Sequence, residues 1–161
     1  MFTSTAFGLA IALIGLIEPS QPLDRQALAG YRLTPAVFAT FQHASREIAA
    51  IVARDASFRS APLFSQDIVQ AADLVEAATQ LEARLTGHVE LAAALRTAKV
   101  TPRDYTIFAL SLLGARLAFG FVEAGTLKSV PVGAAADNVA FVRAHRAAVD
   151  EVLTTLGVEI K

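Results

Sequence analysis

Residues 100–125 read VTPRDYTIFALSLLGARLAFGFVEAG, and this stretch decides the fold. Thr101 is a good helix N-cap, and Pro102 suits the first helical position because its φ is already helical. Asp104 follows the cap by three residues, as the acidic member of a capping box does. Gly125 is a natural helix stop. The stretch therefore predicts one long helix that is apolar on nearly every side.

We interpret this helix as the buried centre of a bundle and not as a membrane span. Its one interior charge, Arg116, would cost about 2.5–3.5 kcal/mol at the centre of a bilayer. Its N-cap, Thr101 followed by Pro102, is of the kind found in helices of soluble proteins. A helix that is apolar all round fits the centre of a small bundle, where neighbours cover each face.

Four further helices are predicted around it from apolar residues spaced three and four apart. The first begins at Thr34-Pro35 and ends before the break at 57–62, and the second runs from near Ser65 to Thr86-Gly87. The stripe predicted for the second helix is Ala71, Leu74, Ala78, Leu81 and Leu85. A short helix covers 88–98, and the last runs from 137 to 156.

These elements predict an all-α fold, an antiparallel bundle of four main helices with an apolar N-terminal helix as signal or anchor. We divide the chain into an apolar segment at 1–17, a linker at 18–33 and a helical bundle domain at 34–157. No strand is needed anywhere.

The N-terminal segment, MFTSTAFGLAIALIGLI (1–17), carries no charged side chain. It has the length of a signal-peptide core, but no Lys or Arg precedes it and no A-x-A site follows. We favour a signal peptide or uncleaved anchor over a helix packed within the fold or a lipid-facing contact with partner subunits. The expected location is the periplasm, free or membrane-anchored.

Composition narrows the classes of function. The chain has 161 residues, 54% of them hydrophobic and 18% charged, which is enough to bury a core. A net charge of −1 argues against nucleic acid as a partner, because nucleic-acid binders usually present a basic face. The absence of cysteine removes disulfides, thiolate metal sites and cysteine nucleophiles.

Catalytic and metal-binding motifs are missing. The sequence has no GxGxxG, no GxxxxGK[ST] and no GxSxG, and no histidine has a glutamate three residues before it. Met1 is the only methionine, which argues against a haem held by His and Met. We therefore expect no metal and no cofactor, and a non-catalytic protein. A weaker alternative is an enzyme that uses His145 as a base.

Four residues stand out as candidates for ligand binding. Asn138 and His145 fall on the apolar face of the last helix, where a buried polar group must find a hydrogen bond. Either they form hydrogen bonds within the fold and are structural, or they line a small-molecule pocket together with Tyr105 or Arg116. Arg116 either reaches the surface and pairs with a carboxylate, or binds a ligand. His43 reads as solvated and His88 as a loop or cap residue.

The phrases VTPRDYTIFALSLL and DNVAFVRAH resemble helix starts in small, mostly exported bacterial proteins of uncharacterised function. Those proteins open one helix with a "TPREY"-like phrase and the last helix with an "NVAFVxxH"-like phrase. The matching residues here are Thr101, Pro102, Arg103, Asp104 and Tyr105, then Asn138, Val139, Phe141, Val142 and His145. The resemblance implies a helical fold and an envelope location, and it implies no activity.

Two functions follow as expectations. The first is a non-catalytic envelope protein, an accessory or partner-binding subunit of a membrane-associated assembly that touches the membrane through residues 1–17. The alternative is a carrier or sensor that holds a small apolar ligand between its helices.

Overall fold

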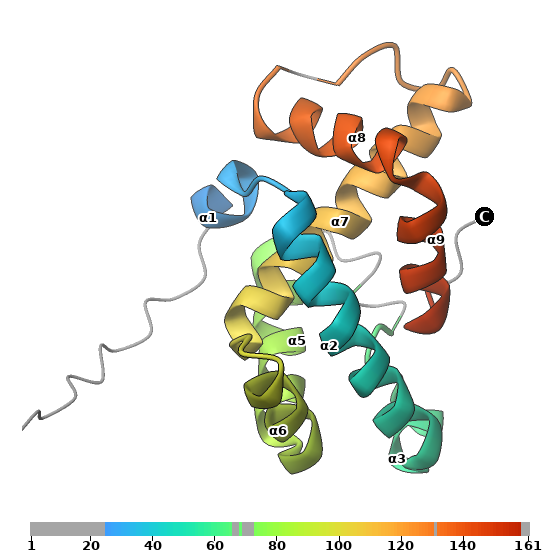
Figure 1. Cartoon of the computed structure of the whole chain (residues 1–161). Helices are drawn as coiled ribbons and strands as arrows, with labels where there is room; N and C mark the ends of the chain where they lie inside the picture. Colours follow the sequence, from blue (N-terminus) through green and yellow to red (C-terminus); the bar gives the residue numbers. More distant parts are fainter. Residues whose placement is uncertain (1–24, 66–67, 69–72, 131, 159–161) are drawn as a thin grey trace, which may run out of the picture.

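The computed structural model describes residues 25–65, 68, 73–130 and 132–158. Eight helices and no strand occur in this part of the chain, which confirms the all-α class (Figure 1). The predicted signal or anchor at 1–17 lies outside the described residues. The finer prediction, one antiparallel bundle of four main helices, stays a prediction.

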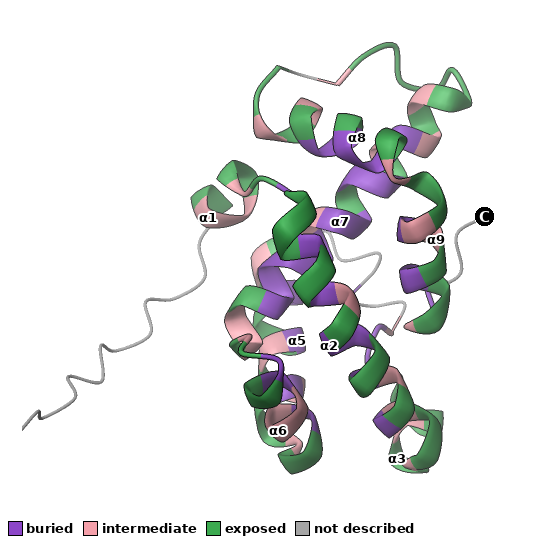
Figure 2. Ribbon diagram, in the orientation of Figure 1, coloured by how far each residue is buried: buried purple, intermediate pink, exposed green. Residues whose placement is uncertain are grey.

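Helix α7 (Pro102–Glu123) occupies the centre, as the sequence predicted (Figure 1). Thr101 Oγ1 accepts the backbone N–H of Asp104 at 3.0 Å and donates to its carboxylate at 2.7 Å. Both bonds fix the first turn of the helix. Figure 2 shows much of α7 in the colour of buried residues, with neighbours on several sides. It packs against α8 and α5 most extensively, and also against α1 and α6.

Helix α2 (Pro35–Arg54) begins at the predicted Thr34 cap, which accepts the N–H of Val37 at 3.3 Å. Its apolar stripe meets α7 through stacked rings. The Phe41 ring lies 4.7 Å from that of Tyr105 and 4.3 Å from that of Phe108, centroid to centroid. These pairs contribute directional packing beyond burial alone and join two helices far apart in sequence.

Helix α5 (Leu74–Gly87) begins later than predicted. Asp73, in extended conformation, accepts the N–H of Val75 at 2.9 Å and is the N-cap. The predicted start near Ser65 is therefore not the start of this helix; Ala71 and its neighbours at 69–72 lie outside the described residues. The stripe residues Leu81 and Leu85 are fully buried, but Leu74 is 56% exposed.

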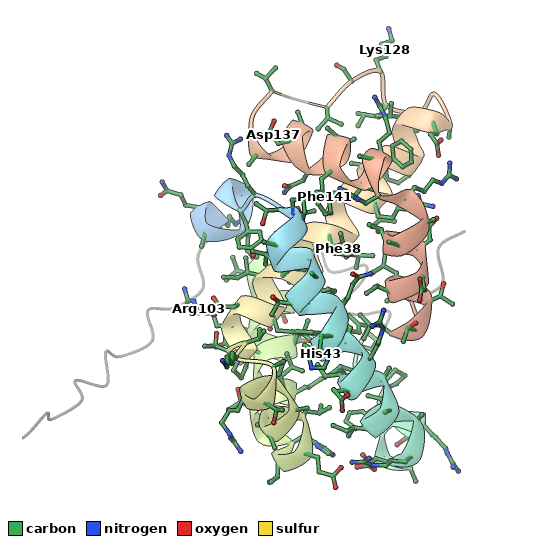
Figure 3. The ribbon with its side chains drawn as sticks, viewed as in Figure 1. Phe38, His43, Arg103, Lys128, Asp137 and Phe141 are labelled. Carbon is green, nitrogen blue, oxygen red and sulfur yellow. The ribbon has the colours of Figure 1, made fainter. Side chains whose placement is uncertain are left out.

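Two short helices complete this end of the fold. Helix α3 (Ser57–Ser60) follows α2, and α6 (Val89–Thr97) follows α5 and packs against α2. His88 separates α5 from α6 and accepts the N–H of Leu91 through Nδ1, so its prediction as a cap residue is confirmed. His43 is exposed on α2, as predicted (Figure 3).

The helix predicted over 137–156 is two helices, α8 (Ala134–Ala144) and α9 (Arg146–Thr155). The break falls at His145, whose φ of −118° and ψ of 24° leave the helical region. Helix α8 packs on α7, whereas α9 packs on α2. One straight helix could not lay its apolar residues against both, so the prediction of a single helix is wrong.

Part of the predicted linker at 18–33 is also structured. Residues 25–30 form α1 (Arg25–Gly30), which contacts α7, α8 and α5. No α1 residue is buried, and Figure 2 shows it as a mostly exposed element beside the core. Leu28 packs against the core from one side, so α1 belongs to the folded unit.

Helix α7 is the one helix of the described residues that is long and apolar enough to cross a membrane, by length and composition. Of its most apolar window, 61% is buried inside the fold.

Candidate functional site

A half-open cavity of about 400 Å³ lies between α1, α5, α7 and α8. Helix α7 supplies one side with small residues, Gly114, Ala115 and Ala118. Leu110 adds to the α7 side, and the other sides are largely aliphatic and come from Leu28, Leu74, Val130 and Val139. The cavity exists because small residues on α7 leave space that neighbouring side chains do not fill. Its size is within the range of small-molecule sites in proteins.

Gly114 leaves open space on the α7 side of the cavity. A Cβ built at Gly114 meets no atom within 4 Å. Leu74, predicted as a core residue, instead lines the cavity from the start of α5, which explains its exposure. A glycine inside a helix costs about 1 kcal/mol relative to alanine, so the open space here has a stability cost.

Three polar side chains line the cavity: Arg25, Ser111 and Asn138. Arg25 is largely exposed and donates to the Asp73 carboxylate at 3.2 Å. That ion pair joins α1 to the first turn of α5. Hydrogen bonds from Val75 and then Arg25 hold the pKa of Asp73 below its ordinary value. The Ser111 hydroxyl is shielded from solvent and has no hydrogen-bond partner.

Asn138 has two partners from the chain that leads into α2. Its Oδ1 accepts the N–H of Leu33 at 2.8 Å, and its Nδ2 donates to the Tyr31 carbonyl at 2.8 Å. The side chain is buried and satisfied. The segment after α1 is thereby fixed to α8, and an exposed ion pair between Arg32 and Asp137 lies beside it.

Tyr105 lies away from the cavity and does not reach the surface. It is fully buried, and its hydroxyl forms a 3.0 Å hydrogen bond with Ser45 Oγ. Burial raises its pKa well above the ordinary value for tyrosine. Tyr105 therefore connects α7 to α2.

Arg116 pairs with Asp150 on α9, Nε to Oδ1 at 2.7 Å. The guanidinium also lies 5.8 Å from the centre of the Phe119 ring, where Arg143 and Arg146 approach at 5.7 and 5.6 Å. Arg146 bonds Glu123 at 3.1 Å. These contacts join the end of α7 to α8 and α9.

His145 is half-buried at the break between α8 and α9. Its ring centre lies 4.5 Å from that of Phe141 and 6.4 Å from that of Phe38. Figure 3 shows Phe38 and Phe141 where α2 and α8 meet, and their rings are 5.5 Å apart. The histidine thus extends an aromatic cluster.

The four predicted residues do not converge on one site. About three helical turns, or roughly 16 Å, separate Tyr105 from Arg116 along α7. Only Asn138 lines the cavity. Sequence reasoning missed Ser111 as a site residue; a lone serine in an apolar helix was the available signal. The structure leaves open space at Gly114.

A second, more open hollow of about 380 Å³ lies between the starts of α2 and α7. Its lining includes Tyr31, Phe41, Tyr105 and Phe108, with Lys99 and Asp104 also contributing. Burial and then the charge of Asp104 raise the pKa of Tyr31. The described residues contain no group of three or more acidic, histidine or cysteine side chains that could hold a metal.

Comparison with protein-family models, with curated proteins and with solved structures gives no match.

Proposed function

We propose that this protein is a carrier or sensor that binds a small, mostly apolar ligand in the cavity between α1, α5, α7 and α8. The observation that carries the proposal is the cavity of about 400 Å³ with aliphatic sides. The apolar side chains that line this half-open space remain accessible to water, as Leu74 is at 56% exposure. An apolar ligand would remove that surface from water, which is favourable.

The composition of the cavity favours apolar ligands over charged ones. Its charged lining residue, Arg25, is paired with Asp73. The remaining lining is aliphatic apart from the neutral Ser111 and Asn138. Burial of apolar surface at about 25 cal/mol per Å² then supplies the driving force for binding.

The test is binding of N-phenyl-1-naphthylamine, a neutral dye whose fluorescence rises in apolar surroundings. We expect saturable binding to the full chain. Gly114→Leu should weaken it strongly, because the new side chain projects into open space and occupies part of the cavity. Gly114→Ala, which fills far less volume, should retain most of the binding.

The matched control is Gly87→Leu at the end of α5. A Cβ there also meets nothing within 4 Å, but Gly87 does not line the cavity. It should leave dye binding unchanged. Equal binding by wild type and Gly114→Leu, with both folded by circular dichroism, would refute the proposal.

A second candidate function is binding of a protein partner, as expected for an accessory subunit of a membrane-associated assembly. It is supported by apolar side chains left exposed at the end of α7 and just after it: Leu117, Phe121 and Leu127. Phe121 is 53% exposed, and large exposed aromatic groups are common at interfaces. Replacing Phe121 with Ser should release such a partner without changing dye binding.

Two expectations accompany these functions as proposals. We propose that α2, α5, α7 and the α8–α9 pair form an antiparallel bundle, in a protein of the bacterial envelope, periplasmic or anchored through residues 1–17. Membrane fractionation before and after removal of residues 1–22 tests the location. A full chain found only in the soluble cytoplasmic fraction would contradict it.

A further inference from the structure

We infer that the ligand is a neutral molecule with one hydrogen-bond acceptor, such as a ketone or an ester, and that the Ser111 hydroxyl donates to it. This inference rests on the proposed function, because it names the chemical class that the same cavity takes.

The Ser111 hydroxyl lacks the partner that helical serines usually find. Such hydroxyls commonly donate to the carbonyl of the preceding turn, which for Ser111 would be that of Ile107. No such bond is present, and the oxygen is shielded from water. An unpaired buried hydroxyl is costly, so a partner supplied by a ligand would recover that cost.

The position of Ser111 brings this donor to the ligand. The residue lines the cavity from α7, where its neighbours Leu110, Gly114 and Ala118 are apolar. The hydroxyl is shielded from solvent in its present position, so donation to the ligand requires it to rotate about the single side-chain torsion of serine towards the cavity when the ligand binds. A ligand acceptor placed there meets a single donor in an otherwise apolar wall.

Asn138 adds a second neutral group to the lining. Its amide has two N–H donors, and one of them is used on the Tyr31 carbonyl. Its Oδ1 accepts from Leu33, and that bond fixes the side chain in place. The fixed amide and the serine offer hydrogen bonds without charge.

The charges around the cavity argue against an anionic ligand. A carboxylate buried there would be desolvated, and burial of an unpaired charge is very unfavourable. Arg25, the available cation, already has the Asp73 carboxylate as its partner at 3.2 Å. A neutral acceptor avoids both costs.

The experiment compares two isosteric competitors for N-phenyl-1-naphthylamine: acetophenone and α-methylstyrene, which has CH₂ in place of the carbonyl oxygen. We measure the ratio of their inhibition constants in wild type and in Ser111→Ala. Because the same two compounds are used, their different hydration cancels between variants. In Ser111→Ala, acetophenone should become a weaker competitor relative to α-methylstyrene by about 3–10-fold, the usual effect of losing one hydrogen bond.

Thr106→Val is the matched control. Thr106 also carries a buried hydroxyl without a partner, on the same helix, but it does not line the cavity. Its removal should leave the ratio unchanged. Circular dichroism melting of each variant verifies that the fold is intact.

The outcomes separate this inference from the proposed function. If the dye does not bind, or neither compound displaces it, the proposed function fails. If both displace it and the ratio is the same in Ser111→Ala, the ligand class is wrong and the carrier function stands. Stronger competition by benzoate than by acetophenone would also overturn the inference, since it would show an anion site at Arg25.

Discussion

At the scale of single residues, the buried polar groups are used to hold helices together. Asn138, Tyr105 and Arg116 each have a partner from a distant part of the chain. The sequence singled these residues out as candidate ligand contacts, Asn138 because it is polar on an apolar face and Arg116 because it is the one charge inside an apolar run. It could not identify their partners, because the partners lie 34 to 107 positions away in sequence.

Asn138→Ala should lower the free energy of unfolding by about 2 kcal/mol, because it leaves the buried N–H of Leu33 and the Tyr31 carbonyl unpaired. Urea denaturation followed by circular dichroism measures the change. Gln80→Ala, which removes an exposed hydrogen bond to Glu76 within α5, should cost under about 0.5 kcal/mol. Equal losses in the two variants would contradict the structural role of Asn138.

The two tyrosines, Tyr31 and Tyr105, should ionise above the ordinary pKa of 10.0, since burial raises the pKa of both. A raised folded-state pKa stabilises the fold below pH 10 and loses that contribution as pH rises through the folded value. Absorbance at 295 nm should show Tyr105 ionising together with alkaline unfolding. Ionisation of both tyrosines at pH 10, while the chain is still folded, would contradict the burial of Tyr105.

At the scale of elements, local signals predicted α7 and the start of α2 well. Thr-Pro at each start satisfies the first turn without outside help, so the caps could be identified from the sequence alone. The break at His145 could not be predicted, because nothing in the 137–156 periodicity marks it. It arises from packing, since α8 and α9 lie on different neighbours.

The turn after α2 begins with Asp55, a carboxylate whose hydrogen bonds are sensitive to acid. Hydrogen bonds from His88 first and then from Ser57 lower the pKa of Asp55 to about 2. A depressed carboxylate pKa stabilises the fold above its unfolded value and loses that contribution as pH falls from 3.8 towards 2.

Asp55→Asn should therefore lower Tm near neutral pH, and the difference from wild type should shrink as pH approaches 2. Differential scanning calorimetry across this range measures it. Glu151→Gln, which also removes one exposed carboxylate, on α9, is the control for the loss of a surface charge. A constant difference between Asp55→Asn and wild type at every pH would contradict the pKa assignment.

At the scale of the whole molecule, the helical class and most of the apolar stripes were predictable. The cavity was not, because it consists of volume that side chains leave empty. Only the placement of α1, α5 and α8 shows that no helix fills the space beside Gly114 and Ala118.

The end of α7 is joined to α9 by ion pairs of unequal burial. Asp150→Asn should cost about 1–2 kcal/mol of unfolding free energy, because the Arg116 side chain is only 10% exposed and loses its carboxylate. Glu123→Gln breaks the more exposed pair with Arg146 and should cost under about 1 kcal/mol. Urea denaturation ranks the two, and the reverse order would contradict this account.

The bonds from Asn138 to the segment after α1 also bear on how the chain reaches its structure. They join residues 105 and 107 positions apart, so they close a loop of most of the described chain. Closing so long a loop costs conformational entropy before the hydrogen bonds of Asn138 can offset it. Formation of these bonds is therefore delayed during folding. Docking of α1 should be a late event, and its amides should exchange with solvent deuterium by local opening while those of α7 exchange only on global unfolding.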